Sequence, residues 1–330
     1  MRTDYGRTFI ALLGIVVFVS LASLGMGSQW MSPIALSRSL LGYGNETQQM
    51  IVWSFRMPRV LLVLLVGWGI AISGVMMQGV LRNDLAEPGI LGVTTGGNLG
   101  ITLALSLFGI QIASPWTLPA MSMAGGLCVV LAVCGLAIDR GGIYPARLLL
   151  TGVAVSAAVG AFTLVLSLNV DRQIYSQALA WATGSFNKAD WNYVLALAAW
   201  LGILMPVVMA ICPILNILRL RDENVISLGV SVFHWRLLLL VIAVALGSAA
   251  MAMSGGIVFL GLIAPHIARR LIGPQHGRLV PTTGLVGMLL LLVADTAGRT
   301  LLAPVEIPAG IMVGGVGGIY FVYQLMTTKG

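Results

Sequence analysis

The sequence predicts an all-α, polytopic membrane protein with about ten transmembrane helices in one domain spanning residues 1–330. Two observations predict this class. The 330 residues include 18 Lys or Arg and 11 Asp or Glu, a charged share of 9%, against about 25% in soluble domains. The hydrophobic share is 58% and the mean hydropathy is +0.98. A soluble enzyme and a disordered chain are therefore both excluded.

Stretches without charge locate the helices, because a spanning helix needs about 20 mostly apolar residues. The stretch after Glu87 is interrupted by prolines at 115 and 119, and the stretch after Arg236 by glycines at 255 and 256, so each holds two helices. The first apolar stretch is long for a signal peptide, and we expect it to be retained. The predicted helices cover residues 8–27, 60–80, 90–109, 117–138, 146–168, 191–213, 236–253, 257–271, 280–302 and 307–326.

The distribution of basic residues predicts that both termini are cytoplasmic. In that orientation 12 of the 18 basic residues lie inside and 6 outside, as the positive-inside rule requires. The net charge of +7 is then explained by the retention of basic residues on the cytoplasmic side. Because the basic residues form no continuous stripe, we expect no nucleic-acid partner. The inside residues are Arg2, Arg7, Arg82, Arg140, Arg147, Arg219, Arg221, Arg236, Arg269, Arg270, Arg278 and Lys329, and the outside residues are Arg38, Arg56, Arg59, Arg172, Lys188 and Arg299.

Small residues recur at four-residue spacing in three predicted helices. Such rows let helix backbones approach closely in lipid. They either pack helices within the chain or, for the second and third rows, line a subunit interface or a substrate path. The rows are Gly92, Gly96 and Gly100; Gly152, Ser156 and Gly160; and Gly310, Gly314 and Gly318.

Charged residues on the predicted outer side form two short motifs. Arg56 and Arg59 flank Pro58 just before a membrane helix, near one face of a helical turn. They either anchor the chain at the interface or dock an acidic partner. Asp295 and Arg299, four residues apart on one helix, can pair. That pairing either holds Arg299 ready for docking or neutralises a charge near the membrane.

Several motifs carry a family resemblance. Residues 74–93, GVMMQGVLRNDLAEPGILGV, resemble the signature of the FecCD/BtuC-type permeases of ATP-binding-cassette (ABC) importers for iron–siderophore complexes, haem and cobalamin. Asp84 departs from the pattern, where the family usually has proline. The resemblance covers roughly residues 50–326 and includes RMPR at 56–59, LGV at 228–230, GIVFLGLIAPH at 256–266, ADTAGR at 294–299 and EIPAG at 306–310.

The resemblance implies a type II ABC importer permease in the bacterial cytoplasmic membrane. Its implied partners are a second permease in a homodimer or heterodimer, two cytoplasmic ATP-binding subunits, an extracytoplasmic substrate-binding protein and membrane lipid. The implied cargo is a ferric siderophore, with haem or cobalamin as alternatives. A rival class, the ion-coupled carrier, needs ionisable residues within the membrane, and Asp295 is the candidate for that role.

The resemblance also implies site residues. Arg56, Arg59 and Arg299 match positions that dock the binding protein. Asn83 and Leu85 match a gate at the inner end of the pore, although a turn and helix-entry role is an equal alternative. The inner loop, about 214–236, is expected to form a short helix, a glycine turn and a second short helix that couple to the ATPase. Its implied coupling residues are Arg221, Asp222, Glu223, Leu228, Gly229 and Val230, and Arg221 stands where the family often has glycine.

Chemical motifs that would indicate an enzyme are missing from the sequence. There is no GxxxxGK[ST] phosphate loop and no nucleophile–His–acid set. His266 has no second ligand at metal-binding spacing. We therefore expect a non-catalytic transport subunit with no metal or cofactor, driven by ATP hydrolysis on a partner.

Overall fold

The computed structural model describes residues 5–27, 30–112, 114, 116–139, 142–143, 145–168, 176, 179 and 181–327. Four basic residues used to predict orientation, Arg2, Arg140, Arg172 and Lys329, lie outside this part.

Ten helices follow the ten predicted segments. Seven of the described helices are long and apolar enough to cross a membrane. By contrast α5 and α12 have 16 and 13 residues, fewer than the roughly 20 that a full span needs. The ten are α1 (Tyr5–Gly25), α4 (Met57–Leu81), α5 (Val93–Phe108), α6 (Thr117–Ala137), α7 (Pro145–Ser167), α9 (Trp191–Ile217), α11 (Val232–Ser254), α12 (Leu260–Ile272), α13 (His276–Thr300) and α14 (Ala309–Thr327).

Short elements that the hydropathy pattern did not predict join these helices. In α2 (Pro33–Leu40) the Ser32 hydroxyl accepts a hydrogen bond from the Ala35 amide at 3.2 Å, and Asn45 caps α3 (Glu46–Met50) in the same way, as N-cap residues do. The others are η1 (Ile51–Arg56), η2 (Pro88–Leu91), η3 (Ile110–Ile112), α10 (Asp222–Ser227), β1 (Ile138–Asp139) and β2 (Gly142–Ile143). The two strands pair antiparallel.

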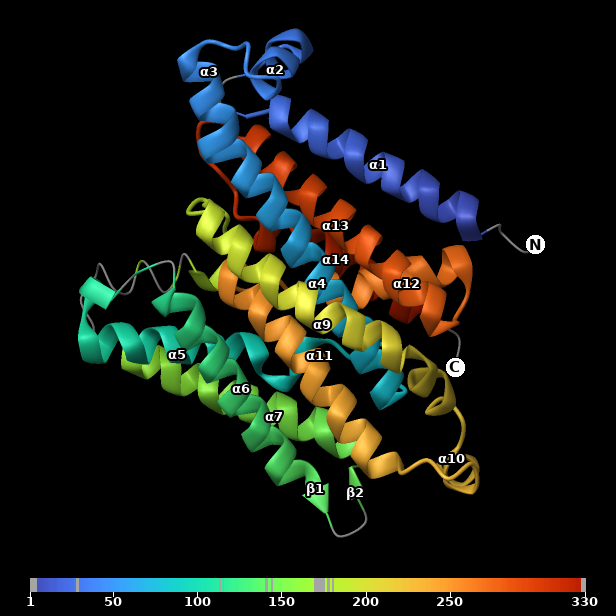
Figure 1. The fold of residues 1–330 in the computed structure, drawn as a ribbon. Coiled ribbons are helices and arrows are strands. Elements are labelled where there is room, and N and C mark those ends of the chain that lie inside the picture. Colours follow the sequence, from blue (N-terminus) through green and yellow to red (C-terminus); the bar gives the residue numbers. More distant parts are fainter. Residues whose placement is uncertain are drawn as a thin grey trace.

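The central helix is α4, which packs against α9, α11, α12 and α13. Glycines allow its close contacts: a Cβ atom at Gly67 would lie 2.6 Å from the carbonyl oxygen of Gly287. Lipid supplies no hydrophobic drive between helices, so backbone approach of this kind stabilises the packing. Helices α5, α6 and α7 form a second group beside this core (Figure 1).

The three predicted rows of small residues have different surroundings. A Cβ atom at Gly96 would lie 2.5 Å from the carbonyl oxygen of Gly125 in α6, so the first row packs helices within the chain. In the second row, Gly152 faces the backbone of Ile90. No described atom lies within 4 Å of a Cβ atom added at Gly160, Gly314 or Gly318. The second and third rows therefore include positions that face away from the chain.

The two ends of the bundle carry different elements. Helices α2 and α3 lie at one end, whereas α10 and the β1–β2 pair lie at the opposite end (Figure 1). In the inner loop the predicted first short helix and glycine turn are confirmed, as α10 and Gly229, but the predicted second short helix is wrong. After the turn at Gly229, which has φ of +78°, the chain enters α11 at Val232 and continues without a break to Ser254. Residues 232–235 therefore belong to the long helix and form no separate element.

Candidate functional site

The carboxylate of Asp295 pairs with two arginines near the C-terminal end of α13, at the end of the bundle opposite α10. Asp295 is 1% exposed, and its Oδ1 atom lies 2.9 Å from Nη2 of Arg59 in α4. Its Oδ2 atom accepts a hydrogen bond from Nε of Arg299 at 3.1 Å. The predicted pairing of Asp295 with Arg299 is thus confirmed, and Arg59 joins the same group. Arg59 also reaches Glu306, with Nη1 and Oε2 3.0 Å apart.

The C-terminal end of α1 covers the guanidinium groups of Arg56 and Arg299. Nη1 of Arg56 donates to the carbonyl oxygen of Leu24 at 2.6 Å. Arg299 donates to the carbonyl oxygen of Met26 at 3.1 Å and to the Ser23 hydroxyl at 2.8 Å. The orphan carbonyls at a helix C-terminus attract cations, which explains why the chain encloses these arginines there.

The structure therefore brings the three predicted docking arginines together, but in a largely buried arrangement. Arg56 is 9% and Arg299 7% exposed, and the Arg59 side chain is 15% exposed. Glu306, which the sequence motif included without a role, is the more accessible member at 37%. We name Arg56, Arg59, Asp295, Arg299 and Glu306 the arginine cluster.

At the other end, Asn83 and Leu85 lie in the turn that follows α4. The Asn83 Oδ1 atom accepts a hydrogen bond from the Leu85 amide at 2.9 Å, the short-range contact by which asparagine shapes a turn. Arg82 ends α4 with φ of +48°, a left-handed conformation that is uncommon for a residue with a side chain. We call residues 82–85 the gate turn.

Asp84, the departure from the family pattern, ties the gate turn to α12. Its Oδ1 atom lies 2.7 Å from Nη1 of Arg269, and Nη2 of the same arginine donates to Oε1 of Gln78 at 3.0 Å. A proline at position 84 could not make this ion pair. The turn is therefore fastened to α12 by a contact that the usual family residue lacks.

Just beyond the gate turn, Glu87 meets the start of α12. Its Oε2 atom accepts a hydrogen bond from the Phe259 amide at 2.9 Å, and Glu87 is 6% exposed. Phe259 has φ of +67°, which is strained for a bulky residue. Burial raises the pKa of Glu87 to about 7, and the Phe259 amide acts against that rise; the hydrogen bond satisfies a free amide at the start of α12.

The loop between α9 and α11, residues 218–231, carries the predicted coupling residues. We call it the coupling loop. Val225 of α10 is fully buried, whereas Leu228 is 61% and Ile226 63% exposed. Arg221 and Glu223 are also exposed. Exposed apolar side chains beside charged ones are typical of a protein-binding surface.

Asp222 differs from its neighbours because its carboxylate is engaged within the chain. Arg236 of α11 holds both oxygen atoms, at 3.0 and 2.9 Å, and Nη2 of Arg82 lies 2.6 Å from Oδ1. Partial burial acts to raise the pKa of Asp222, but the hydrogen bonds and charges of Arg236 and Arg82 hold that pKa below its usual value.

Sequence reasoning missed several members of these groups. From the sequence, Arg82 and Arg236 contribute only to the predicted orientation, and no motif assigns a role to Glu87. Arg82 and Asp222 are 140 positions apart in the sequence, so no local pattern could pair them. A weak signal was available for Glu87, because an acidic residue stands in an otherwise apolar run beside Pro88.

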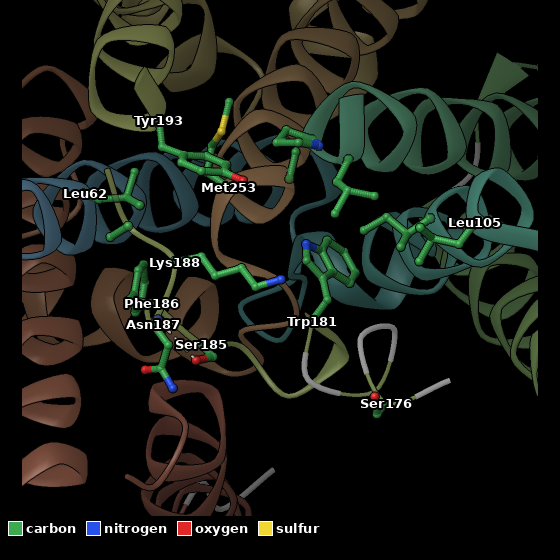
Figure 2. Close-up of a pocket in the computed structure, with 15 residues that line it drawn as sticks. Leu62, Leu105, Ser176, Trp181, Ser185, Phe186, Asn187, Lys188, Tyr193 and Met253 are labelled. Atoms are coloured by element: carbon green, nitrogen blue, oxygen red, sulfur yellow. Dashed lines mark hydrogen bonds between the residues drawn. The ribbon is translucent and has the colours of Figure 1, made fainter. Parts of the chain in front are cut away.

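A cavity of about 350 Å³ is lined in part by Trp181 and residues 185–189. Apolar side chains form most of its wall, and Figure 2 shows Lys188 and Trp181 facing the same space. No predicted site residue is among the described residues that line it. The arginine cluster, the gate turn and the coupling loop are therefore separate from this cavity.

Comparisons with known proteins agree over nearly the whole chain. Residues 15–327 match the family model of the FecCD transport family. The iron(3+)-hydroxamate import system permease protein FhuG of Bacillus subtilis is 38% identical over 334 residues, covering 99% of each chain. The hemin transport system permease protein HmuU of Yersinia pestis is 37% identical, covering 98% of each chain.

A solved structure of a metal-chelate type ABC transporter in an inward-facing conformation shares the fold. It superimposes with a TM-score of 0.85 and 29% sequence identity, over 98% of this chain and 100% of that chain.

Proposed function

Because this chain belongs to the FecCD transport family, we propose that it is the membrane permease subunit of an ABC importer for ferric siderophores. The observation that carries the proposal is the match of residues 15–327 to the family. Iron(3+)-hydroxamate and Fe(3+)-citrate permeases of Bacillus subtilis are among the relatives, each 38% identical. The chain is a multi-pass membrane protein that acts with an ATPase and a binding protein. We further propose that both termini are cytoplasmic, with the coupling loop inside and the arginine cluster outside.

The arginine cluster is proposed to dock the binding protein. Guanidinium groups bind carboxylates in an orientation-specific way, and Arg56, Arg59 and Arg299 gather at one end of the bundle. Arg59 and the more exposed Glu306 form the accessible edge of the cluster, where an acidic side chain of the partner could compete with Glu306 for Arg59. A partner that reaches Arg56 and Arg299 has to displace the end of α1.

The coupling loop is proposed to bind one ATPase, with Leu228 and Ile226 as apolar contacts and Arg221 and Glu223 as charged ones. Gly229 supplies the turn, and Val230 leads into α11. The gate turn, with Asn83 and Leu85, is proposed to narrow the inner end of the pore, since a bulky apolar residue beside a polar one suits a constriction.

A second permease is proposed to pack against α7 and α14. Gly160, Gly314 and Gly318 present backbone to the outside, which allows close helix–helix contact in lipid. On α14 the apolar side chains of Val316 and Ile319 are 67% and 75% exposed. Two such chains would enclose a pore between them, and two ATPases would complete the importer.

Uptake into proteoliposomes tests the function. Proteoliposomes that contain the full complex are loaded with ATP. The binding protein and a ⁵⁵Fe-labelled ferric hydroxamate are then added outside. We expect uptake that requires ATP, the ATPase and the binding protein, and that is unaffected by ionophores. Uptake that ionophores abolish would instead identify an ion-coupled carrier. ATP-driven uptake of haemin or cobalamin, but of no ferric hydroxamate or ferric citrate, would show that the cargo is wrong.

A further inference from the structure

We propose that the ion pair between Arg82 and Asp222 is the link that carries movement of the coupling loop to the gate turn. This inference rests on the proposed function. It assigns Arg82 and Asp222 as positioning residues, and it separates Asp222 from the other coupling residues, which face outward to meet the ATPase.

Arg82 is held by two contacts with the coupling loop. Its Nη2 atom lies 2.6 Å from Oδ1 of Asp222, and its Nε atom donates to the carbonyl oxygen of Leu218 at 2.6 Å. Leu218 is the first residue of the coupling loop, and Asp222 is the first residue of α10. One guanidinium therefore bridges two points of the loop on which the ATPase is proposed to act.

Arg82 also lies directly beside the gate residues in the chain. Arg82 is bonded directly to Asn83, whose side chain forms the gate turn by accepting from the Leu85 amide. Its backbone is already in the left-handed conformation that ends α4. A displacement of Arg82 therefore acts at the hinge between a rigid helix and the turn, with no flexible segment between them.

Asp222 and the gate turn are each held by a further helix. Arg236 projects from α11 with a side chain 7% exposed and binds both oxygen atoms of Asp222, which fixes the orientation of the carboxylate. On the far side of the gate turn, Asp84 is tied to Arg269 of α12. The gate turn is thus connected to the coupling loop through Arg82 and to α12 through Asp84. Motion of α10 therefore changes the position of the gate turn relative to α12.

Isolated ion pairs between partly exposed side chains contribute little to stability. The Arg82 side chain is 30% and the Asp222 side chain 44% exposed. Cutting the contact of Arg82 alone should consequently cost little stability, because Arg236 still binds both oxygen atoms of Asp222. A transmitting pair would leave folding and ATP hydrolysis intact while separating hydrolysis from transport.

The experiment compares R82Q and R82K with R278Q in the complete reconstituted complex. Arg278 is an exposed arginine at the start of α13 whose guanidinium stacks on Tyr5 at 5.5 Å, so R278Q is a matched change outside the link. Three quantities are measured: ATP hydrolysis, uptake of the ⁵⁵Fe-labelled ferric hydroxamate, and the maleimide labelling rate of an L85C reporter with and without ATP and vanadate. Cys128, Cys134 and Cys212 are replaced by serine in the labelling series.

For R82Q we expect ATP hydrolysis within about twofold of the parent complex and a loss of at least about fivefold in transport per ATP, the low end of typical coupling effects. L85C labelling should no longer respond to nucleotide. R82K keeps the charge but lacks the planar guanidinium that reaches Asp222 and Leu218 through two separate nitrogen atoms, so it should recover part of both responses. R278Q should match the parent complex in all three measurements.

Three outcomes would overturn the link. The first is R82Q with parental transport per ATP or parental nucleotide response at L85C. The second is a parallel loss of ATP hydrolysis and thermal stability in R82Q, which would indicate a structural role. The third is an L85C labelling rate that ignores nucleotide in the parent complex. Failure of the proposed cargo is distinguishable, because it removes ferric hydroxamate uptake from the parent complex while the labelling response to ATP remains.

Discussion

Arg59 and Asp295, 236 residues apart in the sequence, meet with Nη2 and Oδ1 2.9 Å apart. Asp295 is 1% exposed and also accepts from Arg299. One buried carboxylate therefore balances two guanidinium groups from different helices, α4 and α13, near the end of α1. This relationship leads to the first prediction, because it makes the carboxylate the most sensitive member of the arginine cluster.

Replacing Asp295 by asparagine should lower the stability of the folded chain. The change leaves Arg59 and Arg299 close together without their shared counter-charge, and breaking a buried pair in this way costs about 3–5 kcal/mol. Thermal unfolding of the detergent-solubilised protein measures the effect. The matched control is E306Q, since Glu306 is 37% exposed and an exposed pair is worth about 0–1 kcal/mol. Equal melting temperatures for the two variants would contradict the prediction.

Replacing Arg59 by alanine should weaken docking of the binding protein. An arginine at the centre of an interface contributes about 2 kcal/mol or more, which corresponds to about 30-fold in affinity. Surface plasmon resonance with the complex in nanodiscs measures the dissociation constant. Arg38→Ala serves as control, because Arg38 is an exposed arginine of α2 outside the cluster. If both variants bind as the parent does, Arg59 is not a docking residue.

Enlarging Gly314 to leucine should impair pairing with the second permease while the chain itself folds. No described atom lies within 4 Å of a Cβ atom at Gly314, so the chain has room for the side chain, but a close helix contact does not. Gly135→Leu in α6 is the control, since that position is equally open. Size-exclusion chromatography with light scattering reports assembly, and an unchanged complex for Gly314→Leu would remove α14 from the interface.

Gly125→Ala should destabilise the chain, in contrast to changes at the open positions. A Cβ atom there would collide with the carbonyl oxygen of Gly96 and with the backbone of Gly100. Overpacking of this kind costs about 1–3 kcal/mol. Thermal unfolding beside Gly135→Ala distinguishes the two sites, and equal melting temperatures would show that α5 and α6 can separate without cost.

Leu228→Ser should weaken association with the ATPase. Leu228 is 61% exposed on the coupling loop, and burial of such a side chain is worth about 1.5–3 kcal/mol. Co-purification of the ATPase with the tagged permease measures the loss. Leu301→Ser is the control, because Leu301 is 64% exposed just after α13. Retention of the ATPase by Leu228→Ser at the parental level would argue against Leu228 as a contact.

The order of the membrane helices could be predicted from the sequence, and all ten predicted segments correspond to helices. Charge-free apolar stretches identify them because a backbone in lipid has to satisfy its hydrogen bonds within the helix. Ser32 and Asn45 are residue types that favour helix N-caps, but the short helices that they begin have no hydropathy signal. The extra helix predicted before Arg236 was wrong, because nothing in the sequence separates residues 232–235 from α11.

The candidate site was predicted less completely. The family motifs located Arg56, Arg59 and Arg299 correctly as a group, but they gave no indication that α1 covers two of them. Asp222 was predicted to meet the ATPase, yet its carboxylate binds Arg82 and Arg236. Gly314 and Gly96 belong to similar rows in the sequence, although Gly96 packs on α6 and Gly314 faces outward.

The sequence by itself determined the membrane class, the helices and their order, because these depend on local composition and on hydrogen bonds within each helix. Only the tertiary structure decided the partners of the few charges: Asp295 with Arg59, Asp84 with Arg269, and Asp222 with Arg82. These contacts join residues that are far apart in the chain. Their geometry depends on how glycine-lined helices approach one another, which no local pattern specifies.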